Sequence, residues 1–184
     1  MKRPLPSLKA QALALLARRE QSRAELRTKL LAHARKLALA HAESVPFSAD
    51  PLLAFLNPEA LPAPADPPEP GDLAREVDEV LDWLAAHRHQ SDERFAESRI
   101  HARASRLGQA RIRQELSRHG VELDADTVRQ LRDTELERAR EVWRKRFPEP
   151  ATDLAGRAKQ MRFLAARGFA ADVVRRVVGG RDDD

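Results

Sequence analysis

Two segments in the second half of the chain repeat one pattern, and this repeat constrains the fold more than any other feature. Arg111-Ile-Arg-Gln-Glu-Leu116 is followed by His119-Gly120-Val121, and Lys159-Gln-Met-Arg-Phe-Leu164 is followed by Arg167-Gly168-Phe169. In both copies a glycine comes four residues after the last core leucine, and an apolar residue follows the glycine. This pattern is typical of a helix that ends in a left-handed glycine. The two copies, 48 residues apart, predict a tandem array of helical units.

The first half of the chain contains a third copy that is interrupted by prolines. A segment ending at Leu30 matches the other copies, but Leu30 precedes Leu116 by 86 residues, which is 38 more than the period. Eight of the 12 prolines lie between Pro46 and Pro70, and proline breaks helices because it lacks a backbone donor. The excess length therefore predicts a proline-rich insertion over about residues 35–71.

Outside the insertion, the composition and the spacing of apolar residues are those of helices. Aromatic residues make up 4% of the chain and Tyr is absent, so residues that favour β-sheets are scarce. Apolar residues recur at helical spacing along almost every segment. We therefore expect an all-α protein of about nine helices in three tandem three-helix repeats, forming an elongated curved array. The expected limits of the repeats are residues 1–90, 91–133 and 134–180.

Several residues are expected to serve the fold. Ser22 and Glu25 have the spacing of a capping box, in which side chains satisfy backbone groups at a helix start. Asp92 follows Ser91 at another expected helix start, where a carboxylate complements the helix dipole. The full set of structural positions is Ser22, Glu25, Asp92, Phe95, Gly120, Gly168 and Phe169.

The sequence offers no candidate catalytic or metal site. Cysteine is absent, which excludes thiolate ligands and a thiol nucleophile. His87 and His89 are two residues apart and would face different sides of a helix, and no phosphate-binding glycine motif occurs. We therefore expect a protein that is not an enzyme and uses no metal or cofactor. With no apolar run long enough for a membrane span and no signal peptide at residues 1–6, we expect a cytoplasmic location.

Charge alternates along the chain, although the net charge is only +4. Residues 1–36 hold ten Lys or Arg and two acids, residues 37–86 hold one and ten, and residues 87–119 hold eight and four. This distribution favours anionic partners that meet particular faces. For any single arginine, a solvated helix exterior is the alternative.

Arginines dominate the second basic zone. On a helix from Asp92 to Leu107, Arg99, Arg103 and Arg106 would lie within about 60° of one another. Guanidinium groups suit phosphates and carboxylates because they form bidentate hydrogen bonds, so nucleic acid and an acidic protein groove are both possible partners. The candidate binding residues are Arg99, Arg103, Arg106, Arg111, Arg113, Arg118, Lys159, Arg162 and Arg167.

Three blocks of the chain, residues 12–34, 91–121 and 159–178, resemble the RecX family of bacterial RecA regulators. The most specific phrases are Asp92-Glu-Arg-Phe-Ala-Glu97, Arg111-Ile-Arg-Gln-Glu-Leu116 and Arg167-Gly-Phe169. The sequence departs from the usual pattern in the insertion, in Ala34 where a glycine normally closes the second helix, and in Arg99 where an aromatic residue is common.

The resemblance implies a function that the spacing alone does not. It implies a protein that binds the RecA filament on DNA and negatively modulates RecA ATPase and recombinase activity, within homologous recombination, DNA repair and the SOS response. It also implies weak binding to single- and double-stranded DNA through phosphates, and no membrane partner. We expect this protein to be a monomer.

Two other readings remain open on the residues alone. Gly120 between two helices is also typical of a helix-turn-helix corner, which would make the chain a DNA-binding module that acts without RecA. Asp124 and Asp126 at the start of the second helix argue against this, because they would repel phosphate. A hydrolase is the third reading, and it would need a site that the sequence does not show.

Overall fold

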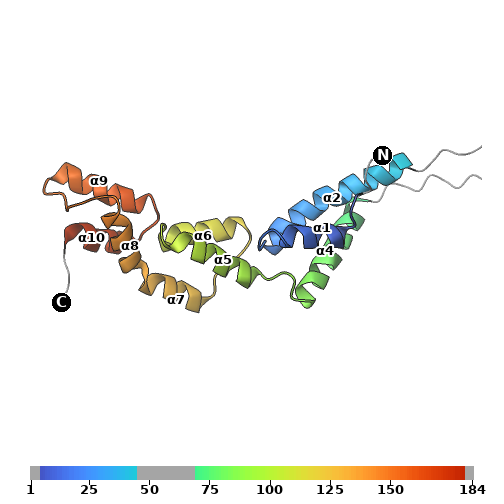
Figure 1. The fold of residues 1–184 in the computed structure, drawn as a ribbon, viewed down its shortest axis with the longest axis horizontal. Coiled ribbons are helices and arrows are strands. Elements are labelled where there is room, and N and C mark those ends of the chain that lie inside the picture. Colours follow the sequence, from blue (N-terminus) through green and yellow to red (C-terminus); the bar gives the residue numbers. More distant parts are fainter. Residues whose placement is uncertain (1–4, 45–68, 181–184) are drawn as a thin grey trace, which may run out of the picture. The chain divides into compact units, whose positions relative to one another are not determined.

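The computed structural model describes residues 5–44 and 69–180, and the chain divides into two compact units, Met1–Gln90 and Ser91–Asp184. Nine α-helices and no strand occur in these two ranges (Figure 1). The predicted all-α fold is therefore confirmed. In the same ranges, no helix combines the length and the apolar character that crossing a bilayer requires.

The described part of the Met1–Gln90 unit consists of α1 (Leu8–Leu16), α2 (Arg23–Ser44) and α4 (Pro70–Ala86). α2 packs against both other helices, and its closest neighbour is α4. The apolar stripes of the three helices meet in one core, where burial of each large side chain contributes roughly 1.5–3 kcal/mol. Its most buried members are Ala12, Leu26, Leu30, Val77, Leu81 and Leu84.

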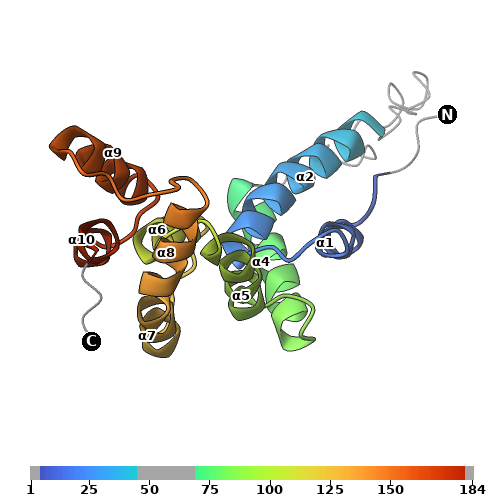
Figure 2. The same cartoon turned by 60° about the vertical axis from the view of Figure 1, so that its left-hand side comes forward.

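The Ser91–Asp184 unit contains six helices around two cores. The first core joins α5 (Asp92–Ala104), α6 (Gln109–Arg118) and α7 (Ala125–Asp133), and the second joins α8 (Glu135–Arg144), α9 (Leu154–Ala165) and α10 (Ala171–Gly179). Only Thr134 separates α7 from α8, so one helix leads directly into the next (Figure 2). Together with the core of the first unit, the described helices thus form three groups of three.

The two predicted glycine helix ends are confirmed. Gly120 has φ +71° and Gly168 has φ +81°, both in the left-handed region that favours glycine. Val121 N–H donates to the Leu116 carbonyl at 3.0 Å, and Phe169 N–H donates to the Leu164 carbonyl at 3.4 Å. These bonds satisfy carbonyls at the helix ends, and the buried Val121 and Phe169 add the apolar contact beyond each glycine.

The first repeat ends its second helix differently. The predicted end lay near Ala34, but α2 continues to Ser44. Ala34 holds the position of Gly120 and Gly168 in the other copies, and as a good helix former it gives the chain no reason to leave the helix. Residues 35–44 are therefore helical, α4 begins at Pro70, and the rest of the predicted proline-rich insertion lies outside the described residues.

The predicted caps hold the starts of α2 and α5. Ser22 is fully buried, and its hydroxyl accepts a 3.1 Å hydrogen bond from Glu25 N–H. Ser91 accepts a 3.2 Å hydrogen bond from Arg94 N–H, and Asp92 lies in the first turn that follows. Phe95, 1% exposed, then enters the core of the second group. Local caps therefore fix where these helices begin.

Candidate polyanion-binding groove

A groove with a volume of about 680 Å³ lies in the Ser91–Asp184 unit. Its lining comes from the corner between α5 and α6, from the end of α8 and from the last turn of α9 and the residues after it. We call it the basic groove, because five of its nine lining residues are cationic and none is acidic. The cations are Arg103, Arg106, Lys145, Arg146 and Arg167, and the other four residues are Ser105, Leu107, Val142 and Phe163.

The α5–α6 corner places two of these cations. A helix to Leu107 was predicted, but α5 ends at Ala104, and the amides of Arg106 and Leu107 both turn back to the Arg103 carbonyl, at 2.9 and 3.0 Å. The chain turns here, and α6 starts after Gly108. The predicted ridge of three arginines along one helix is therefore wrong, although Arg103 and Arg106 do line the same groove.

Arg99, the third arginine of the predicted ridge, pairs with Glu115 on α6. The Glu115 carboxylate lies 3.4 Å from Arg99 Nη1 and 3.3 Å from Arg103 Nε. The Arg99 side chain is 24% exposed and that of Arg103 is 39% exposed. Arg99 is therefore held by an internal carboxylate, and Arg103 reaches the groove with part of its charge compensated.

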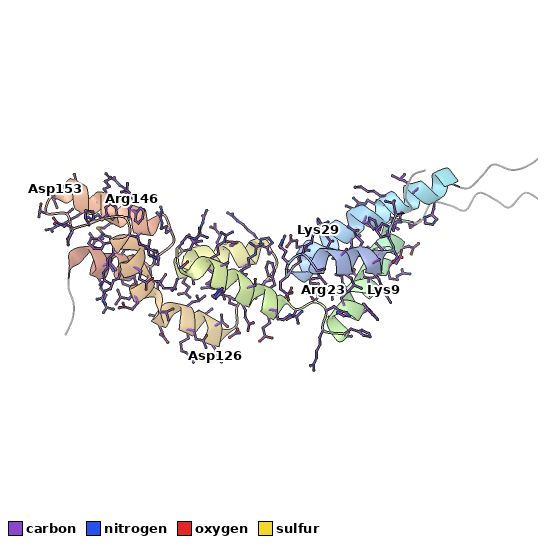
Figure 3. All side chains as sticks on the ribbon, in the orientation of Figure 1. Lys9, Arg23, Lys29, Asp126, Arg146 and Asp153 are labelled. Carbon is purple, nitrogen blue, oxygen red and sulfur yellow. The ribbon has the colours of Figure 1, made fainter. Side chains whose placement is uncertain are left out.

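The other wall of the basic groove comes from α8 and α9. Lys145 and Arg146 are exposed directly after α8, and Figure 3 labels Arg146 at this end of the unit. The Arg167 guanidinium lies 3.7 Å from the centroid of the Phe163 ring and donates to the Phe163 carbonyl at 3.2 Å. A cation held over an aromatic face in this way is oriented without losing its charge.

A close backbone contact joins the two walls. Gly108 N–H donates to the Arg167 carbonyl at 3.0 Å, and Ala110 N–H donates to the Gly168 carbonyl at 3.2 Å. A Cβ atom at Gly108 would lie 2.2 Å from the Gly168 carbonyl oxygen. Glycine is therefore required at Gly108 for the corner to approach the end of α9 this closely.

The remaining predicted residues lie outside this groove. Arg111 donates to Gln114 at 3.0 Å and lines a small depression beside Gly168, and Arg113 lines a separate depression that also includes Glu122. Three more are exposed on α6 and α9, namely Arg118, Lys159 and Arg162. The structure thus brings Arg103, Arg106 and Arg167 together and leaves the other six predicted residues outside the groove.

Two groove residues, Lys145 and Arg146, were missed by the sequence reasoning. The run Arg144-Lys145-Arg146 at the end of an expected helix was the only signal for them. Their importance depends on the end of α8 lying beside the α5–α6 corner, and sequence spacing does not reveal this proximity.

The helix-turn-helix reading finds no support at α7. Asp124 caps this helix, and its carboxylate accepts from Thr127 N–H at 2.8 Å and from the Thr127 hydroxyl at 2.6 Å. The hydrogen bond from the Thr127 side chain, followed by backbone bonds, holds the pKa of Asp124 below its ordinary value. A carboxylate whose ionised form is favoured therefore stands where a recognition helix would meet DNA.

His87 and His89 lie close together in the structure. The reasoning that His87 and His89 face different sides was wrong, because α4 ends at Ala86 and the two rings stack with centroids 6.4 Å apart. Even so, no group of three or more His, Asp or Glu side chains suited to a metal occurs in the part of the chain that the structure describes.

Comparison with known proteins identifies the family. The model described as RecX, second three-helix domain, matches residues 91–125, and the model described as RecX, third three-helix domain, matches residues 133–178. A protein named Regulatory protein RecX from Ralstonia pickettii is 41% identical over 186 residues, covering 98% of this chain and 94% of the relative. The protein of the same name from Leptothrix cholodnii is 43% identical over 178 residues, covering 96% and 90%.

A more distant relative, Regulatory protein RecX from Neisseria meningitidis serogroup C, is 33% identical over 175 residues and covers 94% of this chain and 89% of its own. Such identity over nearly the whole length of both chains exceeds what a shared fold alone would produce. The chain belongs to the RecX family of regulatory proteins.

Proposed function

We propose that the protein binds the RecA filament on DNA and negatively modulates RecA ATPase and recombinase activity. Its family supports a regulatory role, and the modulation of RecA is the role attached to that family name. The observation that carries the proposal is the basic groove, with five cationic residues and no acid in its lining. A groove of this composition attracts a polyanion.

The groove has the chemistry to hold a nucleoprotein filament. Its three guanidinium groups form bidentate hydrogen bonds with phosphates or carboxylates. Leu107, Val142 and Phe163 add apolar contact area between the cations. Binding of this kind depends on the backbone of DNA and on acidic side chains, and it is tolerant of base sequence.

Regulation then follows from occupancy, and the protein acts without catalysing a reaction. A protein seated on the filament hinders the addition of RecA subunits and the changes that accompany ATP hydrolysis. The same cations account for weak binding to single- and double-stranded DNA in the absence of RecA. The proposal includes a cytoplasmic location, where a bacterial filament on DNA is found, and a monomer that needs no cofactor for this binding.

A titration into RecA filaments tests the proposal. The protein is added to RecA on single-stranded DNA with ATP, and ATP hydrolysis and filament length are measured. We expect both to fall as the protein approaches equimolar amounts. The proposal fails if neither changes, whatever the protein does to naked DNA.

A further inference from the structure

Arg138, in the middle of α8, joins three parts of the Ser91–Asp184 unit, although it does not line the basic groove. Its Nη1 donates to the Ala104 carbonyl at 3.1 Å and to the Leu107 carbonyl at 2.7 Å. Its Nη2 donates to the Leu131 carbonyl at 2.7 Å. One guanidinium therefore ties α8 to the end of α5, to the α5–α6 corner and to the end of α7.

These acceptors favour a cation. The last carbonyls of a helix have no partner within it and carry the negative end of the helix dipole. Burial lowers the pKa of Arg138 and the nearby charge of Glu135 opposes this shift, but a guanidinium remains protonated even when it is half buried. Its planar fork spreads five N–H donors over three nitrogens, so it reaches acceptors farther apart than the single nitrogen of an ammonium group can.

Glu135, one turn before Arg138 on α8, binds the other side of the same corner. It is 1% exposed, and its Oε1 accepts a 2.8 Å hydrogen bond from Gln109 N–H in the first turn of α6. Its negative charge suits the positive end of the α6 dipole. Arg138 and Glu135 therefore hold the two residues that flank Gly108, one through Leu107 and one through Gln109.

We propose that Arg138, assisted by Glu135, is a positioning residue that sets the width of the basic groove. The cations of both groove walls are positioned relative to α8. Arg103 and Arg106 lie on the corner that Arg138 of α8 holds, and Lys145 and Arg146 follow directly after α8. Without Arg138 the corner keeps the backbone bonds of Gly108 and Ala110 and the bond of Gln109 to Glu135, but it loses the bonds from α8 to Ala104 and Leu107. The cations of the two walls then no longer meet one ligand together. This inference rests on the proposed function, because it assigns the groove its polyanionic ligand.

A distance measurement tests the positioning itself. The chain has no cysteine, so cysteines introduced at the exposed Ala102 on α5 and Ala158 on α9 are unique sites for spin labels. We expect one narrow distance distribution for the parent protein, a broader or shifted one for Arg138→Gln, and an intermediate one for Arg138→Lys. An unchanged distribution in Arg138→Gln, with helix content retained, overturns the proposal. If Arg138→Gln does not fold, Arg138→Lys decides in the same way.

A double-mutant cycle tests the consequence for binding. The probe is a fluorescent oligothymidine, and the variants are Arg138→Lys, Arg106→Gln and the two combined. We expect Arg138→Lys alone to weaken binding by about tenfold and the added loss from Arg106→Gln to be much smaller than in the parent, because coupled residues are not additive. The matched cycle with Arg118→Gln, on exposed α6 surface outside the groove, should be additive.

The two arms separate the failure of this inference from the failure of the proposed function. Additive losses in the Arg106 cycle overturn the positioning role in the groove, even if the label distances change. A parent protein that binds neither oligothymidine nor the RecA filament refutes the proposed function, whereas the spin-label distances still decide whether Arg138 positions the corner.

Discussion

Basic side chains of α2 in the Met1–Gln90 unit face carboxylates of the same unit, whereas most cations of the basic groove face solvent. Arg27 Nε lies 2.7 Å from Asp78 of α4, and Arg23 Nη2 lies 2.7 Å from Asp82. Figure 3 labels Arg23 and Lys29 on α2. In the groove, Arg103 and Arg99 both pair with Glu115, but none of the other four groove cations forms an ion pair with a described residue.

This difference between the two units shows that a basic segment of the sequence need not form a basic surface, because acidic residues of another segment can neutralise it. Residues 1–36 hold ten cations and residues 37–86 hold ten acids. α2, which begins in the first zone, packs beside α4 of the second. Arg23 and Arg27 of the first zone are thereby compensated inside the unit. Among the described residues no acidic side chain lines the groove, so the charge of its cations is available to a partner.

The largest expected effect is the loss of binding when the groove charge is reversed. The variant Arg106→Glu/Lys145→Glu/Arg146→Glu should bind oligothymidine and RecA filaments at least about 100-fold more weakly, with a salt slope reduced by about 0.7 for each lost phosphate contact. The control Arg175→Glu/Arg176→Glu, on exposed α10 surface, should bind nearly as the parent does. Equal losses in the two variants would show that net charge, and not the groove, attracts the ligand.

Sequence reasoning predicted the fold well where local signals decide it. Gly120 and Gly168 end helices through their own backbone preference, and Ser22 and Ser91 begin helices through bonds to residues three positions away. The end of α2 was missed because Ala34 was treated as an imperfect copy of those glycines, although the preference that ends a helix is absent from alanine.

The groove was predicted only in part because it is not local. Arg106, Arg146 and Arg167 are far apart in the sequence and meet only because Gly108 approaches Gly168 and Arg138 holds the corner. Likewise, Arg99 has the spacing of a surface arginine but is bound by Glu115. Spacing along one helix indicates which residues share a face, but it does not indicate which carboxylate faces them.

The next largest effect tests the backbone contact that joins the groove walls. Gly108→Ala should destabilise the Ser91–Asp184 unit by about 3 kcal/mol, because its Cβ would meet backbone atoms of Gly168 and Phe169 at 2.2–2.3 Å. Gly179→Ala is the control, since a Cβ there meets nothing within 4 Å. Each unit contains one tryptophan, so denaturation followed at Trp143 after Trp83→Phe reports this unit alone. Similar midpoints for both alanine variants would contradict the close approach.

A smaller effect, confined to the other unit, comes from Glu25. Burial would raise its pKa, but hydrogen bonds from Arg19 and Lys29 outweigh burial and bring the pKa to about 2, from an ordinary 4.5. Because the folded-state pKa is lowered, the stabilisation is complete above about pH 5 and is lost as the pH falls from 4.5 towards 2. It amounts to at most about 3 kcal/mol.

Unfolding of the Met1–Gln90 unit, followed at Trp83 after Trp143→Phe, measures this dependence. Glu25→Gln should flatten the loss of stability between pH 4.5 and 2, whereas Glu137→Gln, at an exposed pair with Arg140 in the other unit, should leave the profile unchanged. A Glu25→Gln variant with the parent's acid profile would mean that other carboxylates govern the acid unfolding of this unit.

The smallest effect on stability is expected from the Arg27–Asp78 pair, which represents the paired cations of the Met1–Gln90 unit. Arg27 and Asp78 are linked by two hydrogen bonds, of 2.7 and 2.9 Å, which hold the pKa of Asp78 below its ordinary value. Both side chains are about 40% exposed, and solvent and salt screen such a pair strongly. Arg27→Gln should therefore change the unfolding of its unit only slightly and leave oligothymidine binding as it is, in contrast to Arg106→Gln. Weakened binding in Arg27→Gln would mean that α2 also meets the polyanion and that internal pairing does not remove a cation from recognition.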